Sequence, residues 1–303
     1  MKSFFHIEPL NSMKDWFENL ASHITKAESI RLIVPATLEG ILSTVPLEAA
    51  FLDTKKLFSR RFVPSKIHQP QDEHRIEVPN FKGLSIVLDV ESEHIRVENI
   101  EFDDTLVYLQ PLEIELEFKS SEKQRISSLD VVFLASLLAT LIAPNGKKTR
   151  AIRPMSGLGL WSRAVMDNTI DPMYTIVRNH LQEEGSIRVV PLPEVHHPVL
   201  DMIPELSPRM LKRLSERWGD MNYEERCESL SEFALVGIGN EQISTARLEE
   251  LIWHRVLIGE SDIDAASSIF KLKRSWPSDE KSATLFASKC ADEILSSNKL
   301  PNP

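Results

Sequence analysis

Cysteine is scarce in this chain of 303 residues. Its two cysteines, Cys227 and Cys290, stand far apart and do not form the C-x-x-C spacing of a metal site. This usage indicates a reducing, intracellular setting. An excess of positive charge is also missing, because the formal net charge is −10. Uniform binding to nucleic acid or to an anionic membrane is therefore disfavoured, and any such contact needs a local basic patch.

Long apolar runs are absent as well. The longest run, Val131 to Pro144, is too short to span a bilayer and predicts a buried helix. The first residues, MKSFFHIEPLNSMKDW, lack the apolar core of a secretory signal. We therefore expect a cytoplasmic protein without a membrane partner.

Common catalytic motifs are missing too. The sequence contains no G-x-S-x-G elbow, no phosphate-binding G-x-x-x-x-G-K-[ST] loop and no dinucleotide fingerprint. The pair His196-His197 is flanked by prolines and preceded by a valine, which favours a surface loop over a metal site.

The pattern that is present alternates helices and strands through the first 143 residues. Such alternation predicts an α/β fold with a doubly wound parallel sheet. The run Leu84–Val90 is continuously apolar and predicts a central strand buried on both faces. The other expected elements are a helix at 11–29 with Ser12 as N-cap, strands at 30–34, 58–64, 95–102 and 105–118, a helix from 41 to 53, and a buried helix after Ser127-Ser128.

The expected domain organisation has three parts. Residues 1–145 form the α/β domain, and residues 164–303 form a smaller, mainly helical domain. Residues 146–163 form a basic hinge with no acidic residue. In the second domain we expect one strand near 186–201, one helix that includes Leu248, Arg255 and Val256, and a last helix at 278–296.

The turn after the first strand carries the most informative pattern. A strand, the motif H-x-D-x-D-G and a helix form the first motif of the DHH phosphoesterase superfamily, which includes the RecJ exonucleases. The segment Ile30–Thr44 resembles this motif in its layout. Pro35 stands at the position of the histidine, Thr37 and Glu39 stand at the two aspartates, and Gly40 is kept.

Further positions follow in the order of the family. Asp89, after the apolar strand, resembles the aspartate of the second motif, and Asp103 or Asp104 occupies the place of the D-H-H signature without any histidine. The apolar helix that follows resembles the serine-led helix of the family. The resemblance covers roughly residues 10–143. It implies a parallel-sheet DHH-like domain followed by a second domain, from which the family's glycine-rich substrate element is missing.

The missing ligands predict that the chain is not an enzyme. Two-metal hydrolysis needs metal ions held close together by several ligands at once. Pro35 has no donor atom for a metal, and Thr37 offers only a neutral oxygen. We therefore expect no metal or other cofactor, and we treat Pro35, Thr37, Glu39, Asp89, Asp103 and Asp104 as the positions of a vestigial pocket. Mn²⁺ or Mg²⁺ would enter only if Glu39, Asp89 and Asp103 still formed an altered phosphoesterase site.

The resemblance also implies partners. Within the family, a catalytically inactive RecJ-like factor joins the GINS complex and the MCM ring of the replicative helicase. By this resemblance we expect a non-catalytic scaffold or accessory factor in DNA replication or repair, with GINS and MCM as partners and single-stranded DNA as a possible ligand. The residues expected to contact nucleic acid or an acidic partner are Lys147, Lys148, Arg150, Arg153 and Arg163.

Two other interpretations stay open from the sequence. One is a weakly active or altered Mn²⁺-dependent phosphoesterase or single-strand nuclease. The other is a regulatory or adaptor protein with an unrelated α/β domain, in which the strand ends bearing Glu39, Asp89 and Asp103 do not converge.

Overall fold

The computed structural model describes residues 2–68, 76–93, 95, 102–117, 124–163, 171–203, 208–237, 244–259 and 263–302. Two compact units divide the chain. Unit 1 comprises Met1–Leu160, Pro172–His180 and Trp276–Asn298, and unit 2 comprises Trp161–Asp171, Leu181–Ser275 and Lys299–Pro303. The predicted strand at 95–102 lies largely outside the described residues.

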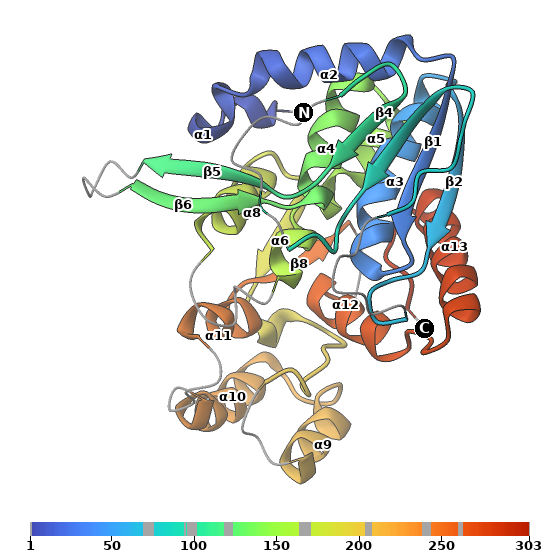
Figure 1. Cartoon of the computed structure of the whole chain (residues 1–303). Helices are drawn as coiled ribbons and strands as arrows, with labels where there is room; N and C mark the ends of the chain where they lie inside the picture. Colours follow the sequence, from blue (N-terminus) through green and yellow to red (C-terminus); the bar gives the residue numbers. More distant parts are fainter. Residues whose placement is uncertain are drawn as a thin grey trace. The chain divides into compact units, whose positions relative to one another are not determined.

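Unit 1 contains the predicted parallel sheet (Figure 1). Its strands lie in the order β2-β1-β3-β4, and every neighbouring pair is parallel. Their bounds are β1 Ser29–Pro35, β2 Leu57–Val63, β3 Leu84–Leu88 and β4 Leu106–Leu109. The mixed α/β fold and the central position of the run from Leu84 are thereby confirmed.

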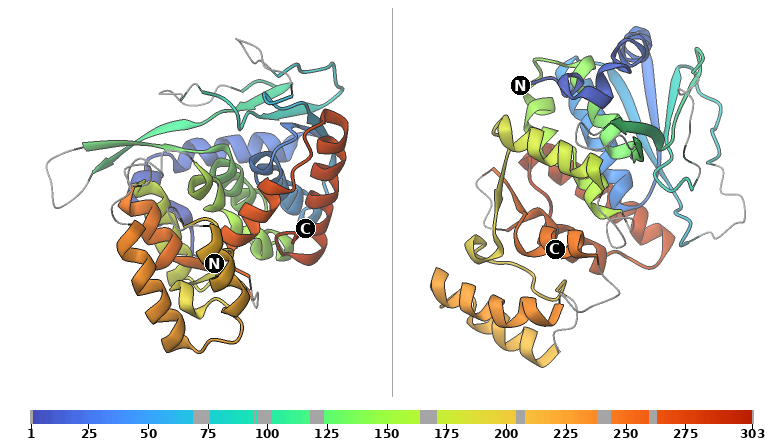
Figure 2. Two further views of the ribbon diagram at one scale, coloured as in Figure 1. Left: turned by 90° about the horizontal axis from the view of Figure 1, so that it is seen from below. Right: turned by 90° about the vertical axis from the view of Figure 1, so that its left-hand side faces the viewer.

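Apolar helices cover one face of this sheet (Figure 2). The helices are α2 (Lys14–Lys26), α3 (Leu38–Asp53) and α4 (Val131–Ile142). Nearly the whole surface of α3 and α4 is buried, which agrees with their continuous apolar sequences. On the opposite face, Ile33 and Val87 pack with Ile76, which comes from the segment before β3.

Two expectations about element boundaries were wrong. Segment 105–118 is two strands, because β4 ends before Pro111 and β5 (Leu112–Glu117) pairs with β6 (Gln124–Leu129) as an antiparallel hairpin. Ser127 and Ser128 lie in β6, and Asp130 caps α4 by accepting a hydrogen bond from the Phe133 amide at 2.7 Å. Pro111 marks the break between β4 and β5, because proline lacks the amide donor that a continuous strand would need.

The N-terminal elements are short. A 3₁₀ turn η1 (Phe4–His6) and helix α1 (Glu8–Asn11) precede α2. Ser12 follows α1 as its C-cap, and Met13 is the N-cap residue of α2, so the predicted cap at Ser12 was wrong. The helix expected at 11–29 is present as α2, which buries Phe17, Leu20 and Ile24 on one face.

The segment expected to be a basic hinge is largely helical. It forms α5 (Lys147–Ile152), the 3₁₀ turn η2 (Arg153–Met155) and α6 (Leu158–Ser162). Several of its side chains are buried, including Ile152 and Leu160. The carboxylate of Asp53 at the end of α3 accepts hydrogen bonds from the amides of Lys148 and Thr149, at 3.3 and 2.9 Å. This contact fixes the start of α5 on unit 1.

The last helix also belongs to unit 1. Helix α13 (Glu280–Ser297) begins after Asp279, whose side chain accepts a hydrogen bond from the Ser282 amide at 2.9 Å, and not after the predicted residue 278. Arg60 of β2 binds Asp292 of α13 at 2.8 Å and Glu48 of α3 at the same distance. Unit 1 therefore takes in residues that the sequence placed in the C-terminal domain.

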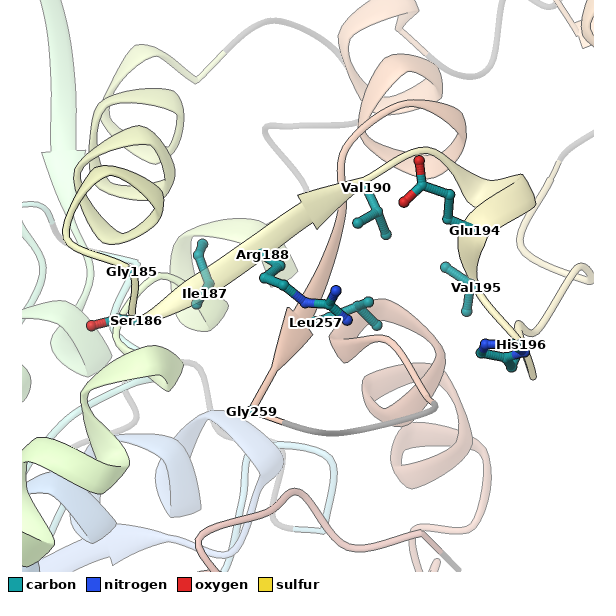
Figure 3. A pocket seen from close by; sticks show the side chains of 10 residues that line it. All are labelled: Gly185, Ser186, Ile187, Arg188, Val190, Glu194, Val195, His196, Leu257 and Gly259. Atoms are coloured by element: carbon teal, nitrogen blue, oxygen red, sulfur yellow. The ribbon is translucent and has the colours of Figure 1, made fainter. Parts of the chain in front are cut away.

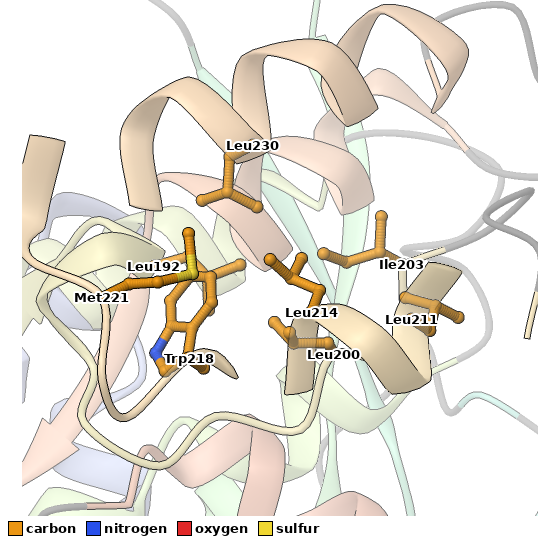
Figure 4. Close-up of a cluster of buried hydrophobic side chains, with 8 residues drawn as sticks. All are labelled: Leu192, Leu200, Ile203, Leu211, Leu214, Trp218, Met221 and Leu230. Atoms are coloured by element: carbon orange, nitrogen blue, oxygen red, sulfur yellow. The ribbon is translucent and has the colours of Figure 1, made fainter. Parts of the chain in front are cut away.

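Unit 2 is mainly helical. It includes α9 (Pro208–Arg217), α10 (Tyr223–Gly237), α11 (Thr245–Ile252), α12 (Ala265–Arg274) and the 3₁₀ turn η3 (Leu192–Glu194), and helix α8 (Pro172–Glu183) ends in it. A buried cluster around Trp218 holds α9 and α10 together (Figure 4). Its members are Leu192, Leu200, Ile203, Leu211, Leu214, Trp218, Met221 and Leu230.

A two-stranded antiparallel sheet completes unit 2. It consists of β7 (Ile187–Val190), the strand expected near 186–201, and β8 (Arg255–Ile258). Arg255 and Val256 were expected in a helix and lie in β8 instead. Arg255 is fully buried, binds Asp264 at 3.0 Å and so closes a salt bridge inside this unit. No described helix of either unit is long and apolar enough to cross a membrane.

Candidate functional site

The turn after β1 is built as a structural cap. Thr37 is the N-cap residue of α3, and its hydroxyl accepts a hydrogen bond from the Gly40 amide at 3.0 Å. A Cβ atom on Gly40 would lie 2.1 Å from the Pro35 carbonyl oxygen, so a residue without a side chain is needed there. The preserved glycine is thus explained by the close approach of the turn to the helix, and Thr37 acts as a helix cap.

A residue far along the chain closes this turn. The indole nitrogen of Trp276 donates a hydrogen bond to the Ala36 carbonyl at 3.2 Å, and the Trp276 ring packs edge-on against Phe286 of α13. Ala36 also donates its amide to the Val63 carbonyl of β2 at 2.8 Å. No spacing in the sequence pointed to Trp276, because it reaches the turn only through the placement of α13.

Asp89 lies at the same edge of the sheet as Glu39. Strands β1 and β3 are parallel neighbours, and the carboxyl ends of parallel neighbours share one edge. The Asp89 side chain is 2% exposed, and its Oδ2 accepts a hydrogen bond from the Tyr108 hydroxyl at 2.8 Å. Its Oδ1 is buried and has no hydrogen-bond partner among the residues that the structure describes. Glu39 is half-buried in the first turn of α3.

Asp103 and Asp104 lie at the opposite edge. Both precede β4, whose first residue Leu106 pairs with Ser85 near the start of β3, whereas Asp89 follows the end of β3. The structure therefore does not bring these two aspartates to Glu39 and Asp89, and the expected acidic pocket is not assembled. The sequence was misleading here because it placed both aspartates after a strand, whereas in the structure they precede β4.

Asp103 has a structural role in the turn before β4. Its Oδ1 accepts hydrogen bonds from the Thr105 hydroxyl, the Thr105 amide and the Leu106 amide at 2.7, 2.7 and 2.8 Å. These donors, with the Thr105 hydroxyl first, lower the pKa of the Asp103 carboxyl. Asp104 is exposed beside it. Within the residues that the structure describes, no three His, Cys, Asp or Glu side chains gather as a metal ion would require.

The five basic candidates do not form one surface. Lys147, Lys148 and Arg150 are exposed on α5. Arg153 is 4% exposed, donates to the Lys2 carbonyl at 2.6 Å and stacks 3.7 Å from the Phe4 ring centroid. Arg163 belongs to unit 2 and binds Asp171 at 3.4 Å. Arg153 therefore has a structural role, and its side chain is too buried to contact nucleic acid or an acidic partner.

Unit 2 contains a pocket that no sequence motif indicated (Figure 3). It measures ≈ 620 Å³ and lies against one face of the β7–β8 sheet. Val190, Val195 and Leu257 form a buried apolar cluster at its base. Arg188 projects from β7 beside Leu257, and Glu194 and His196 line the rim. His196 and His197 are exposed, as the sequence predicted for this loop.

Comparisons with known proteins reveal a structural likeness but no match in sequence. No protein-family model matches the chain, and no curated protein matches it. Among solved structures, the chain is similar to a crystal structure of CDC45 from Entamoeba histolytica, with 10% sequence identity and a TM-score of 0.43. The match covers 95% of this chain and 73% of that chain. No residue's role in this chain follows from a likeness of that degree.

Proposed function

We propose that the chain is a non-catalytic, RecJ-like scaffold or accessory factor in DNA replication or repair. Its function on this view is to bind proteins, and the resemblance stated from the sequence makes GINS and MCM of the replicative helicase the first partners to test. The observation that carries the proposal is the state of the turn after β1. At this turn the Pro35 side chain offers no ligand atom, and the Thr37 hydroxyl and the Ala36 carbonyl are committed to hydrogen bonds of the fold.

The turn supports this view in three ways. The Pro35 side chain has no donor atom, and the Thr37 hydroxyl already accepts a hydrogen bond from the Gly40 amide. The Ala36 carbonyl already accepts a hydrogen bond from the Trp276 indole. Two-metal hydrolysis requires several oxygen or nitrogen ligands around a shared space. Glu39 and Asp89 are the two expected positions that remain at this edge, which is too few for such a site.

A retained phosphoesterase activity is the second candidate. The observation that favours it is the buried Oδ1 of Asp89, which has no hydrogen-bond partner in the described part of the chain although Asp89 is almost fully removed from water. Unsatisfied buried oxygens are rare and are found at functional sites among other places. A single Mn²⁺ or Mg²⁺ held by Asp89 and Glu39 is the form that this activity would take.

One experiment separates the two candidates. Purified protein is incubated with short single-stranded DNA and RNA in millimolar Mn²⁺, beside an Asp89→Asn variant that keeps the shape of the side chain. The proposal expects no phosphodiester cleavage above the variant. Cleavage that disappears in Asp89→Asn would favour the second candidate. In parallel, immobilised wild-type protein is expected to retain purified GINS or MCM, and retention of neither would contradict the scaffold role.

A further inference from the structure

Strand β2 is the outermost described strand of the parallel sheet, so no described strand pairs with its outer edge. The N–H and C=O of one residue in a strand point to the same side. Since the Val63 carbonyl accepts the Ala36 amide, Val63 and every second residue before it face β1. Phe58, Arg60 and Phe62 therefore direct their backbone groups outward. These groups have no hydrogen-bond partner among the described residues.

A groove of ≈ 490 Å³ follows the second half of this edge. The end of β2 forms one side, and the first turns of α13 form the other. Its lining residues are Arg61, Phe62, Val63, Pro64, Glu280, Lys281, Thr284 and Leu285. The Leu285 residue is 64% exposed, which leaves apolar surface open beside unpaired backbone groups. Proteins usually shield such an edge, and an open one is a template for pairing with another chain.

The charges in the groove favour an acidic occupant. Arg61 and Lys281 are exposed, and neither forms an ion pair with a described residue. Glu280 is the one acidic residue in the lining, and it already has an interaction within the protein. Two unpaired cations beside an apolar wall are complementary to a segment that alternates acidic and apolar side chains.

We propose that this groove binds an extended, acidic segment of a partner protein, which pairs with β2 as an additional strand of the sheet. The outward N–H and C=O groups of Phe58, Arg60 and Phe62 pair with the backbone of the segment. Its apolar side chains contact Leu285, and its carboxylates meet Arg61 and Lys281. The inference rests on the proposed scaffold function for the class of partner, whereas the groove itself is a property of unit 1.

A defined peptide tests the binding. The probe is a fluorescein-labelled octapeptide with the sequence Asp-Val-Glu-Val-Asp-Val-Glu-Val, and its control has lysine at every acidic position. Fluorescence anisotropy at low salt is expected to show saturable binding of the acidic peptide and none of the lysine peptide. Because Lys281→Glu replaces an attractive charge by a repulsive one and Leu285→Asp removes an apolar contact, each is expected to weaken binding about tenfold.

Matched variants control for general effects of charge and surface. Lys289→Glu changes another exposed lysine of α13 that does not line the groove. Leu57→Asp changes a 72% exposed leucine at the start of β2, also outside the groove. Both are expected to bind like the wild type. Absence of peptide binding, or equal losses in groove and control variants, would overturn the proposal.

Amide hydrogen exchange tests the pairing geometry. Bound peptide is expected to slow exchange at the Arg60 and Phe62 amides, which point outward, and to leave Ser59 and Arg61 unchanged because these already face β1. Binding without this alternation would exclude an added strand. Other occupants give different results: a concentration-dependent dimer lost in Lys281→Glu would indicate a second copy of the chain, and competition by oligo-dT would indicate a nucleic acid.

Peptide binding and the retention of GINS or MCM test the groove and the scaffold function separately. If wild type and Lys281→Glu retain GINS or MCM equally, the scaffold function stands and the groove is not the docking surface. If the peptide binds with the expected pattern and neither assembly is retained, the surface stands and the proposed partners are wrong.

Discussion

The guanidinium of Arg60 lies 2.8 Å from the Glu48 carboxylate, and this pair joins β2 to α3 in the interior of unit 1. The Glu48 side chain is 2% exposed. Burial raises the pKa of its carboxyl to about 7, and the charge of Arg60 offsets only part of this effect. A carboxyl that is more easily protonated in the folded than in the unfolded protein makes stability depend on pH.

Because this pKa is raised on folding, the contribution of Glu48 is fully present below the unfolded value of 4.5 and is lost as the pH rises to about 7. We expect the free energy of unfolding of the wild type to fall by about 3 kcal/mol across this range through Glu48 alone. Glu48→Gln should remove that part of the decline. Urea unfolding of both proteins between pH 4.5 and 8 measures how the free energy of unfolding depends on pH. The same pH dependence in the wild type and in Glu48→Gln would contradict the prediction.

Asp53 is predicted to hold α5 in place. Its carboxylate accepts the Thr149 amide and hydroxyl, both at 2.9 Å, and acts as an N-cap supplied from another helix. Asp53→Ala is expected to lower the free energy of unfolding by about 1–2 kcal/mol. Asp53→Asn, which keeps an acceptor, should lose less. Gly146→Ala should also be destabilising, because the new Cβ would lie 2.1 Å from Asp53 Oδ2. Thermal unfolding would contradict this if all three variants matched the wild type.

Removing one partner of the buried Arg255–Asp264 pair is predicted to destabilise unit 2 far more than removing one partner of a surface pair. Both side chains are 0% exposed and 3.0 Å apart. Asp264→Ala leaves a buried guanidinium without its partner and should cost about 3–5 kcal/mol. The matched change Asp201→Ala removes a solvent-exposed pair with Arg274, at 3.6 Å, and should cost less than about 1 kcal/mol. Chemical denaturation followed by tryptophan fluorescence compares the two, and equal losses would refute the assignment.

Basic residues of the segment 146–163 are predicted to differ in role. Arg153→Gln should lower the melting temperature, because the guanidinium binds the Lys2 carbonyl and stacks on Phe4. Lys147→Glu should leave the melting temperature unchanged or raise it, since an acidic residue suits the first turn of a helix. Any binding of oligo-dT to this segment should weaken in Lys147→Glu and not in Arg153→Gln. If oligo-dT binding weakened in Arg153→Gln and not in Lys147→Glu, Arg153 would be accessible to the ligand, and the prediction would be wrong.

Periodicity predicted the elements of the core correctly wherever burial is continuous. The runs from Ile30, from Leu84 and from Val131 became β1, β3 and α4, because a long apolar run has no other stable place than between layers. Boundaries were less predictable. Pro111 splits one expected strand into β4 and β5. Arg255, expected in a helix, lies in β8, where Asp264 neutralises its buried charge.

The sequence predicted the position of some candidate-site residues and not of others. Glu39 and Asp89 share an edge, as expected from two parallel strands that each end near a carboxylate. Asp103 does not join them, since it precedes its strand and caps the turn before β4. Trp276 reaches the turn after β1 without any signal in the sequence, because nothing local requires the end of the chain to return to unit 1.

The sequence by itself determined the α/β class, the parallel sheet and the type of residue at each position of the DHH-like turn. These follow from local apolar patterning and from side-chain chemistry, which are properties of short segments. Only the tertiary structure decided which carboxylates share an edge, that α13 packs on unit 1, and that β2 keeps an open edge beside Lys281. Those features depend on strand order and on contacts between residues more than 200 positions apart, such as Arg60 and Asp292.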